Sequence, residues 1–174
     1  FLGKKRLIKT LQLQHSMLVY HGSIRIRVMM NIESLVSKAK QVCDNRGARF
    51  TPIREKVFRL LASAQGGVGA YDLLEQLKIT ETGAKPATIY RALDFLAELG
   101  FIHKIESTNA FMLCHHFDHI HPVQLLICDT CGFVKELHSS VISHELNNLA
   151  AEGGFVVSGQ TIEAHGKCES CRAS

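Results

Sequence analysis

The chain has 174 residues, 46% of them hydrophobic and 21% charged, a composition typical of one or two small globular domains. No apolar run approaches the roughly 18 residues that would indicate a membrane-spanning helix, so we expect no membrane partner. The formal net charge of +4 is unevenly spread, because residues 1–30 carry six basic and no acidic residues, whereas residues 100–174 carry four basic and eight acidic ones. This excess of basic residues at one end is only weak evidence for a nucleic-acid partner.

Residues 1–29 form a basic tail that differs from the rest of the chain. The tail has no clear periodicity, and no small-residue cleavage site follows an apolar core, as a secretion signal requires. We expect this tail to be non-native, arising from read-through upstream of an initiation at Met29 or Met30, or to be disordered. A basic arm that contacts DNA phosphates is the alternative interpretation.

Four helices are predicted in the segment that follows the tail. They are expected at residues 31–47, 51–63, 69–79 and 85–100. In the first, apolar residues recur at helical spacing, and Cys43 lies on this apolar face as an expected core thiol. The second begins with Thr51 as its N-cap and Pro52 at its first helical position. The fourth begins near Pro86 and ends at Gly100.

The hydrophobic period then changes to that of β-strands. Strands are predicted at residues 101–106, 110–115, 123–128, 133–138 and 155–166, with one helix at 139–154. Ser139 or Ser140 caps this helix, and Gly153 and Gly154 end it. Helices followed by a hairpin and then by a β-β-α-β unit predict an α+β protein of two domains. We place these domains at residues 30–116 and 117–174.

Helices followed directly by a hairpin are typical of a winged helix-turn-helix, in which the helix before the hairpin enters the major groove of DNA. Thr88, Tyr90 and Arg91 lie in the first turns of that helix. Arg91 could contact a guanine edge by two hydrogen bonds or a phosphate by its charge. The alternative is that these are ordinary surface residues of a core helix.

Four of the six cysteines form two C-x-x-C pairs, Cys128 with Cys131 and Cys168 with Cys171. Without a secretion signal, this pairing favours metal over disulfides. Two such pairs suit tetrahedral zinc, and four protein ligands leave no open coordination position, so the site would be structural. It would link the end of the chain back to the sheet. A redox-active C-x-x-C is the alternative.

A second group of potential ligands surrounds the hairpin. Its members are His103, Cys114, His115, His116, His119, His121, Glu136, His138, His144 and His165. If Thr108 and Asn109 form a two-residue turn, His103 and Cys114 face each other, with Cβ atoms roughly 5 Å apart. The loop that follows could add either His119 or His121, and Glu136 a carboxylate. A metal with ligands from both domains would fix their relative orientation and so select one conformation.

The chain resembles the ferric uptake regulator family, and within it the zinc uptake regulator branch, over about residues 31–171. The resemblance depends on "RFTPIREKVFRLL", "AYDLLEQL", "KPATIYRALDFLAELGFIHKIESTNAFMLC", "ICDTCGFVKE" and "IEAHGKCESC" taken together. It implies a bacterial, cytoplasmic, homodimeric repressor with an N-terminal winged helix and a C-terminal α/β dimerisation domain. The zinc-loaded form would bind AT-rich palindromic operators of zinc-uptake genes.

The resemblance also implies two zinc ions per chain and a role for particular residues. The structural zinc ligands would be Cys128, Cys131, Cys168 and Cys171. The regulatory zinc ligands would be His103, Cys114, His121 and Glu136, with His119 as the runner-up because the loop before Cys128 looks one residue short. Tyr71 and Arg91 would contact DNA. The thiolate of Cys114 favours zinc over iron or manganese.

Three other functions remain as alternatives to a zinc-dependent repressor. One is a family member that senses iron, peroxide or another divalent metal, and another is a zinc store without an operator. The third is an enzyme, which we do not expect, because no H-E-x-x-H motif is present and neither candidate site leaves a metal position open for water. We therefore expect no small organic substrate.

Overall fold

The computed structural model describes residues 32–64, 66–119 and 121–173, so the basic tail at residues 1–29 lies outside it. The helices are α1 (Ile32–Asn45), α2 (Pro52–Ser63), α3 (Ala70–Lys78), α4 (Pro86–Glu98), α5 (Ser140–Glu152) and α6 (Glu169–Arg172). The strands are β1 (Val68–Gly69), β2 (Ile102–Ile105), β3 (Ala110–Leu113), β4 (Val123–Cys128), β5 (Val134–Leu137) and β6 (Thr161–Gly166). In the described part of the chain, no helix is long and apolar enough to span a membrane.

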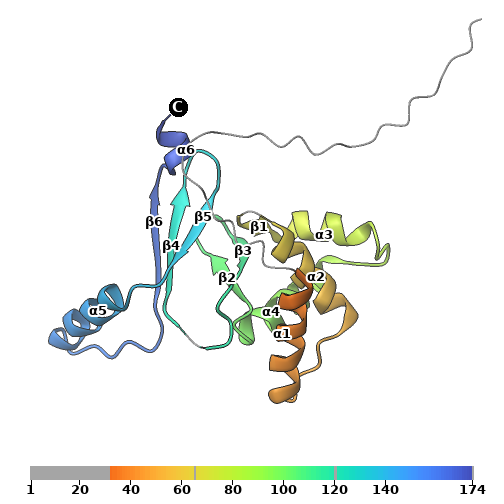
Figure 1. The fold of residues 1–174 in the computed structure, drawn as a ribbon, viewed down its shortest axis with the longest axis horizontal. Coiled ribbons are helices and arrows are strands. Elements are labelled where there is room, and N and C mark those ends of the chain that lie inside the picture. The colour runs from red at the N-terminus through yellow and green to blue at the C-terminus, as the bar shows by residue number, and fades with distance from the viewer. Residues whose placement is uncertain (1–31, 65, 120, 174) are drawn as a thin grey trace, which may run out of the picture.

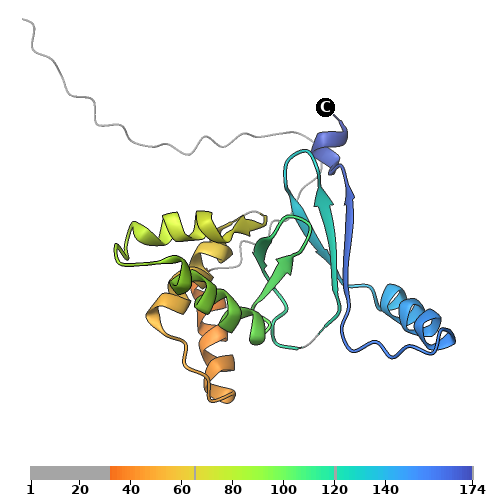
Figure 2. The ribbon, with the colours of Figure 1, turned by 180° about the vertical axis from the view of Figure 1, so that it is seen from behind.

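Every predicted element is present, and the α+β class is confirmed. The short elements β1 and α6 were not predicted, and the last strand is half as long as expected. Helices α1 to α4 gather on one side of the molecule, the β2–β3 hairpin lies at its centre, and the sheet of β4, β5 and β6 lies on the other side (Figure 1). Figure 2 shows the same three-part arrangement from behind.

The helices and the hairpin share one apolar core. Phe58 of α2, Phe101 before β2 and Phe117 after β3 are almost fully buried and meet edge to face, with ring centroids 5.0 to 6.0 Å apart. Cys43 is fully buried in the same core, as predicted for a structural thiol. Strands β1, β3 and β2 form a three-stranded antiparallel sheet in that order, which completes the winged-helix arrangement.

The predicted register of the hairpin is wrong by two residues. His103 pairs with Met112 rather than with Cys114, because four residues connect β2 to β3 instead of two. A two-residue hairpin turn of the favoured kind needs positive φ at both central positions, which a β-branched residue such as Thr108 resists. Only Asn109 of this loop has a positive φ, of 49°. Side chains on a strand alternate between its two faces, so a register shift of two residues leaves His103 and Cys114 on the same face of the hairpin, as diagonal neighbours.

The second sheet has the order β5-β4-β6, with β4 and β5 antiparallel and β4 and β6 parallel. Helix α5 connects β5 to β6 and projects away from the sheet (Figure 1). The Ser139 side chain caps this helix by accepting a hydrogen bond from the Ile142 amide, so the structure resolves the choice between the two serines. Helix α5 has no buried residue, and a hydrogen bond of 2.9 Å from Gln124 Nε2 of β4 to Ser143 Oγ connects it to the sheet.

The hairpin also packs on the second sheet, which joins the two halves of the molecule. Its residues Ile105, Ala110 and Met112 form a second buried cluster with Leu125, Ile127 and Val134 of β4 and β5. At the end of the hairpin, the backbone amides of Glu106 and Ser107 donate hydrogen bonds of 2.6 and 3.1 Å to the carboxylate of Glu163 in β6. Any site built between hairpin and sheet therefore rests on a packed interface. The domain boundary at residues 116 and 117 stays a proposal.

Candidate metal centres and nucleic-acid-facing helix

The four paired cysteines meet at one end of the second sheet. Parallel pairing of β4 and β6 places Cys128 beside Gly166, so Cys168 and Cys171 follow directly onto the turn that holds Cys131. All four sulfur atoms lie within 4.8 Å of one another. The Sγ atoms of Cys131 and Cys168 are 3.7 Å apart. Tetrahedral zinc with Zn–S bonds of about 2.3 Å separates its sulfurs by about 3.8 Å, so this group fits such an ion.

The thiols of this cysteine group differ in their pKa values. Hydrogen bonds from the backbone amides of Cys168 and Cys131 lower the pKa of the Cys128 thiol to about 6, and the Cys168 amide lies 3.3 Å from its sulfur. Hydrogen bonds with Cys131 and Cys168 instead raise the pKa of Cys171 to about 12. One thiolate therefore forms readily at neutral pH, whereas the next requires a cation to replace its proton.

A second group lies between the hairpin and the second sheet. It combines His103 of β2, Cys114 just after β3, His121 of the connecting segment and Glu136 of β5, with ligand atoms within 4.8 Å of one another. The Cys114 Sγ atom is 3.5 Å from His121 Nε2. Tetrahedral zinc bound to one sulfur and one imidazole nitrogen sets this separation at about 3.5 Å.

The carboxylate of Glu136 lies closer to the imidazoles than a bound ion would allow. Its Oε1 atom is 2.9 Å from His103 Nε2 and 2.8 Å from His121 Nε2. Two ligand atoms at about 2.05 Å from tetrahedral zinc are about 3.3 Å apart, so Oε1 would have to move by roughly half an ångström. A χ rotation of Glu136 provides such a shift, and the donor set of two nitrogens, one sulfur and one oxygen fits zinc.

The two acidic groups of this site carry opposite protonation states. Burial raises the pKa of the Cys114 thiol to about 12, and the negative charge of Glu136 adds to this effect. Burial also raises the pKa of Glu136, but hydrogen bonds and charge from His103 and His121 outweigh it and lower the value to about 2. A dication therefore meets a carboxylate that is already charged and a thiol that must release a proton.

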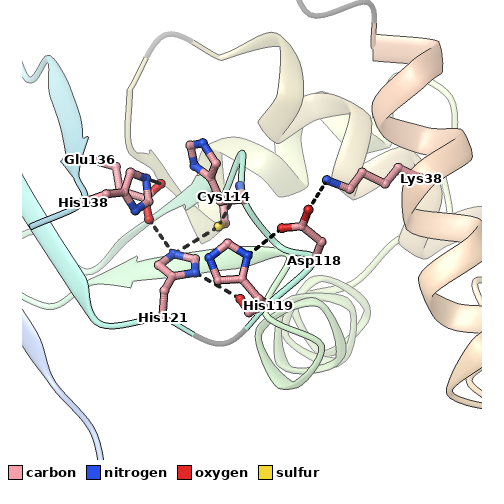
Figure 3. A network of polar contacts seen from close by, with 8 residues as sticks. Lys38, Cys114, Asp118, His119, His121, Glu136 and His138 are labelled. Carbon is pink, nitrogen blue, oxygen red and sulfur yellow. Dashed lines mark hydrogen bonds and ion pairs between the residues drawn. The ribbon is translucent and has the colours of Figure 1, made fainter. Parts of the chain in front are cut away.

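The structure brings His121, and not His119, into this group (Figure 3). His119 has a 62% exposed side chain, and its Nδ1 lies 2.9 Å from Asp118, which in turn pairs with Lys38 of α1 at 2.9 Å. The backbone carbonyl of His119 accepts a hydrogen bond of 3.1 Å from His121 Nδ1. This bond leaves Nε2 of His121 as the atom that faces Cys114 and Glu136, as an orienting contact behind a metal ligand does.

A third group was not anticipated, although all its members were among the potential ligands. It consists of His116, Glu136 and His138, whose ligand atoms lie within 4.8 Å of one another. The signal in the sequence was the spacing of Glu136 and His138, since residues two apart on a strand share a face. Within the described residues, the buried Oε2 atom of Glu136 has no hydrogen-bond donor, a state that costs roughly 1–3 kcal/mol. His115, His144 and His165 belong to none of the three groups.

Helix α4 presents the predicted DNA contacts on its exposed side. It buries Ile89, Ala92, Leu93 and Leu96 against the other helices. Tyr90 and Arg91 are exposed, and Tyr71 on α3 is 69% exposed. Thr88 is half-buried, and its hydroxyl accepts a hydrogen bond of 3.1 Å from the Lys85 amide, which stabilises the start of the helix. Thr88 therefore has a structural role at the helix terminus whether or not it contacts a base.

Comparison with known proteins gives concordant results. The model of the ferric uptake regulator family matches residues 45–165. The zinc uptake regulation protein of Escherichia coli (strain K12) is 46% identical over 140 residues, which cover 80% of this chain and 82% of that protein. A solved structure of a zinc uptake regulator complexed with zinc and DNA superposes with a TM-score of 0.80 at 45% identity, covering 82% of this chain and 96% of that one. The crystal structure of holo XcZur gives 0.74 at 44% identity, covering 81% and 99%.

Proposed function

The chain belongs to the ferric uptake regulator family, and on this premise we propose that it is a zinc-sensing transcriptional repressor that binds AT-rich palindromic operators of zinc-uptake genes when zinc-loaded. The observation that carries the proposal is the His103, Cys114, His121 and Glu136 group, because it spans the interface between winged helix and second sheet. The thiol of Cys114 favours zinc over iron or manganese in this position. We place this activity in the cytoplasm.

We assign a structural zinc ion to Cys128, Cys131, Cys168 and Cys171. The support is the fit of the sulfur separation to a tetrahedral ion and the closed set of four thiolates. The group joins the last residues of the chain to the turn after β4, and without it the short α6 has no buried residue to hold it in place. Its expected role is to stabilise the second sheet rather than to respond to changes in zinc.

We assign a regulatory zinc ion to the second group, which gives two ions per chain. Bound zinc would hold the four ligand atoms at the fixed distances of a tetrahedral coordination geometry. His103 and Cys114 then hold the hairpin, and through it α4, at one angle to Glu136 on β5. Moving a population from 1% to 99% in this arrangement requires about 5.5 kcal/mol of preference for it. We expect a site of four ligands, two of them charged once bound, to supply that preference.

Helix α5 and strand β6 are the surface on which we expect a second copy of the chain to bind. Leu149 is 56% exposed, and Phe155 and Val156, just after α5, are 66% and 89% exposed, which is unusual for apolar side chains so close together. In the described sheet, β6 pairs with β4 on one side only, so its other edge offers unpaired backbone groups. A two-fold dimer through this surface would hold two winged helices at the spacing of two half-sites.

Operator binding by the His103→Ala variant tests this assignment. His103 is a ligand of the regulatory group and has no contact with the four cysteines, so the variant should remain dimeric and retain its cysteine-bound zinc. We expect it to lose the zinc-dependent increase in affinity for an AT-rich palindromic duplex, measured by fluorescence anisotropy. His115→Ala, an exposed histidine that belongs to none of the metal-binding groups, is the matched control and should respond to zinc like the unmodified chain. A normal zinc response in His103→Ala would refute the assignment.

A further inference from the structure

We propose that His116, His138 and the Oε2 atom of Glu136 form a third divalent-cation site, which shares Glu136 with the regulatory group. The site would take an ion of the zinc class, because two imidazole nitrogens and one carboxylate oxygen suit zinc and its neighbours in the first transition series. Three protein ligands leave one position for water. The proposal uses Glu136 of the regulatory group but does not depend on DNA binding or on repression.

The fold brings the three ligands together from two directions. His116 lies on the segment that leaves the hairpin, and its backbone amide donates a hydrogen bond of 3.4 Å to Cys114 Sγ. Glu136 lies in β5 and His138 directly follows the last residue of this strand, and their Oε2 and Nε2 atoms are 3.9 Å apart. Figure 3 shows Glu136 and His138 adjacent, with His121 in contact with the same carboxylate. The proposed site therefore also connects the hairpin segment to the second sheet.

The strongest support is the orientation of the Glu136 carboxylate. Its side chain is 6% exposed, and Oε1 faces His103 and His121 at 2.9 and 2.8 Å. Within the described residues Oε2 has no hydrogen-bond donor, and the nearest ion-pair contact is His138 Nε2 at 3.9 Å. A buried carboxylate oxygen of a native protein is normally hydrogen-bonded or bound to a cation. The oxygen that lacks a hydrogen bond is thus the one that lies nearest to His138.

The distances fit an ion after a small adjustment. Ligands at about 2.05 Å from a tetrahedral ion are about 3.3 Å apart, whereas His138 Nε2 and Glu136 Oε2 are 3.9 Å apart, so a shift of about half an ångström suffices. The rings of His116 and His138 meet edge to face, with centroids 4.2 Å apart and an interplanar angle of 75°. In this arrangement a nitrogen of each ring lies within 4.8 Å of a carboxylate oxygen of Glu136.

The third site should bind more weakly than the regulatory site. It lacks a thiolate, its imidazoles are exposed, and the His138 side chain is 40% exposed. An ion bound there would also lie near the regulatory ion, because one carboxylate connects both, and ions bridged in this way are about 3.5–4 Å apart. Repulsion between two dications at that separation opposes the second binding step, so the third site should fill last.

The test is a count of metal ions per chain at controlled free zinc. The full chain, with its four-cysteine site filled, is dialysed to equilibrium against zinc buffers of increasing activity, and bound zinc is measured by atomic emission. We expect the count to reach two and then three. His138→Gln should stop at two, its third-site affinity falling by at least the roughly 10- to 100-fold that loss of even an indirect metal contact causes. His115→Gln, the matched control at an exposed histidine outside the three groups, should reach three.

Cobalt(II) spectra separate this proposal from the regulatory one. Cobalt at the regulatory group should show a thiolate charge-transfer band that depends on Cys114, whereas cobalt at the third site should not, because its ligands are nitrogen and oxygen. His138→Gln should keep the band and lose one ion, and His116→Gln, altered in an exposed residue, repeats the test if the first variant does not fold. A count that stops at two in the unmodified chain, or reaches three in both variants, would overturn the third site. Absence of the Cys114-dependent band would instead refute the regulatory group.

Discussion

Zinc binding at the regulatory group should release the thiol proton of Cys114, and the structure sets the size of the effect. Burial, together with the charge of Glu136, raises the pKa of this thiol to about 12. At pH 7 the thiolate fraction is then roughly 10⁻⁵, and removing the proton costs roughly 7 kcal/mol, at 1.36 kcal/mol per pH unit. This cost is part of the apparent zinc affinity, because only the thiolate is a ligand.

The sign of the pH dependence follows from the raised pKa. Below a pKa of about 12 the metal-free site holds its proton, so each rise of one pH unit weakens proton competition tenfold. Between about pH 6.5 and 7.5 the apparent affinity for the regulatory ion should therefore rise by about tenfold from Cys114 alone. The carboxylate of Glu136 contributes nothing in this range, because its pKa of about 2 keeps it charged throughout.

Calorimetry in two buffers with different ionisation enthalpies measures this proton directly. The chain, with its four-cysteine site already filled, is titrated with zinc in both buffers, and the difference in heat gives the number of protons released. We expect about one proton that depends on Cys114, and Cys114→Ser should release about one fewer. Equal proton release from both proteins would refute the argument, as would an affinity in the unmodified chain that does not change with pH.

Three further substitutions test the other parts of the account. Cys131→Ser removes one of four thiolates and should abolish the dimer and lower the unfolding temperature, and unfolding unaffected by a chelator in the unmodified chain would contradict a structural zinc. Arg91→Ala on α4 should weaken operator binding by about 5- to 150-fold, equivalent to about 1–3 kcal/mol, and unchanged anisotropy would remove it from the DNA surface. Glu163→Gln should lower the free energy of unfolding by about 1–3 kcal/mol in urea titrations, because it weakens the acceptor for the Glu106 and Ser107 amides, whereas Glu98→Gln, at the exposed end of α4, should not.

Sequence patterns were sufficient for features that depend on residues within one turn or one helix. The period of apolar residues, with Pro52 and Pro86 at the first helical positions, located the helices to within one or two residues. The two C-x-x-C pairs predicted a group that the structure brings together, since each pair fixes two sulfurs within one turn. The helix starts and each C-x-x-C pair are decided by residues close together in the sequence, whereas the meeting of the two pairs depends on the parallel pairing of β4 and β6.

Sequence patterns were insufficient where the conformation of a loop residue, or a residue distant in the sequence, decides the geometry. The hairpin register depended on the conformation of Asn109, and its error of two residues preserved the shared face of His103 and Cys114. The choice between His119 and His121 depends on Asp118, which Lys38 of α1 holds from 80 residues away. No spacing rule connects Lys38 to the metal groups, and none foresaw that Glu163 would bind the hairpin amides.

Operator binding as a function of free metal tests the central claim most directly. Anisotropy of a labelled AT-rich palindromic duplex would be followed with free zinc buffered from strong chelation to excess, and with iron(II) and manganese(II) in parallel. We predict that affinity rises steeply with zinc alone, while the ion at the four cysteines stays bound. A rise that follows iron or manganese instead would contradict the zinc assignment at His103, Cys114, His121 and Glu136, and no response to any metal would contradict sensing by this group altogether.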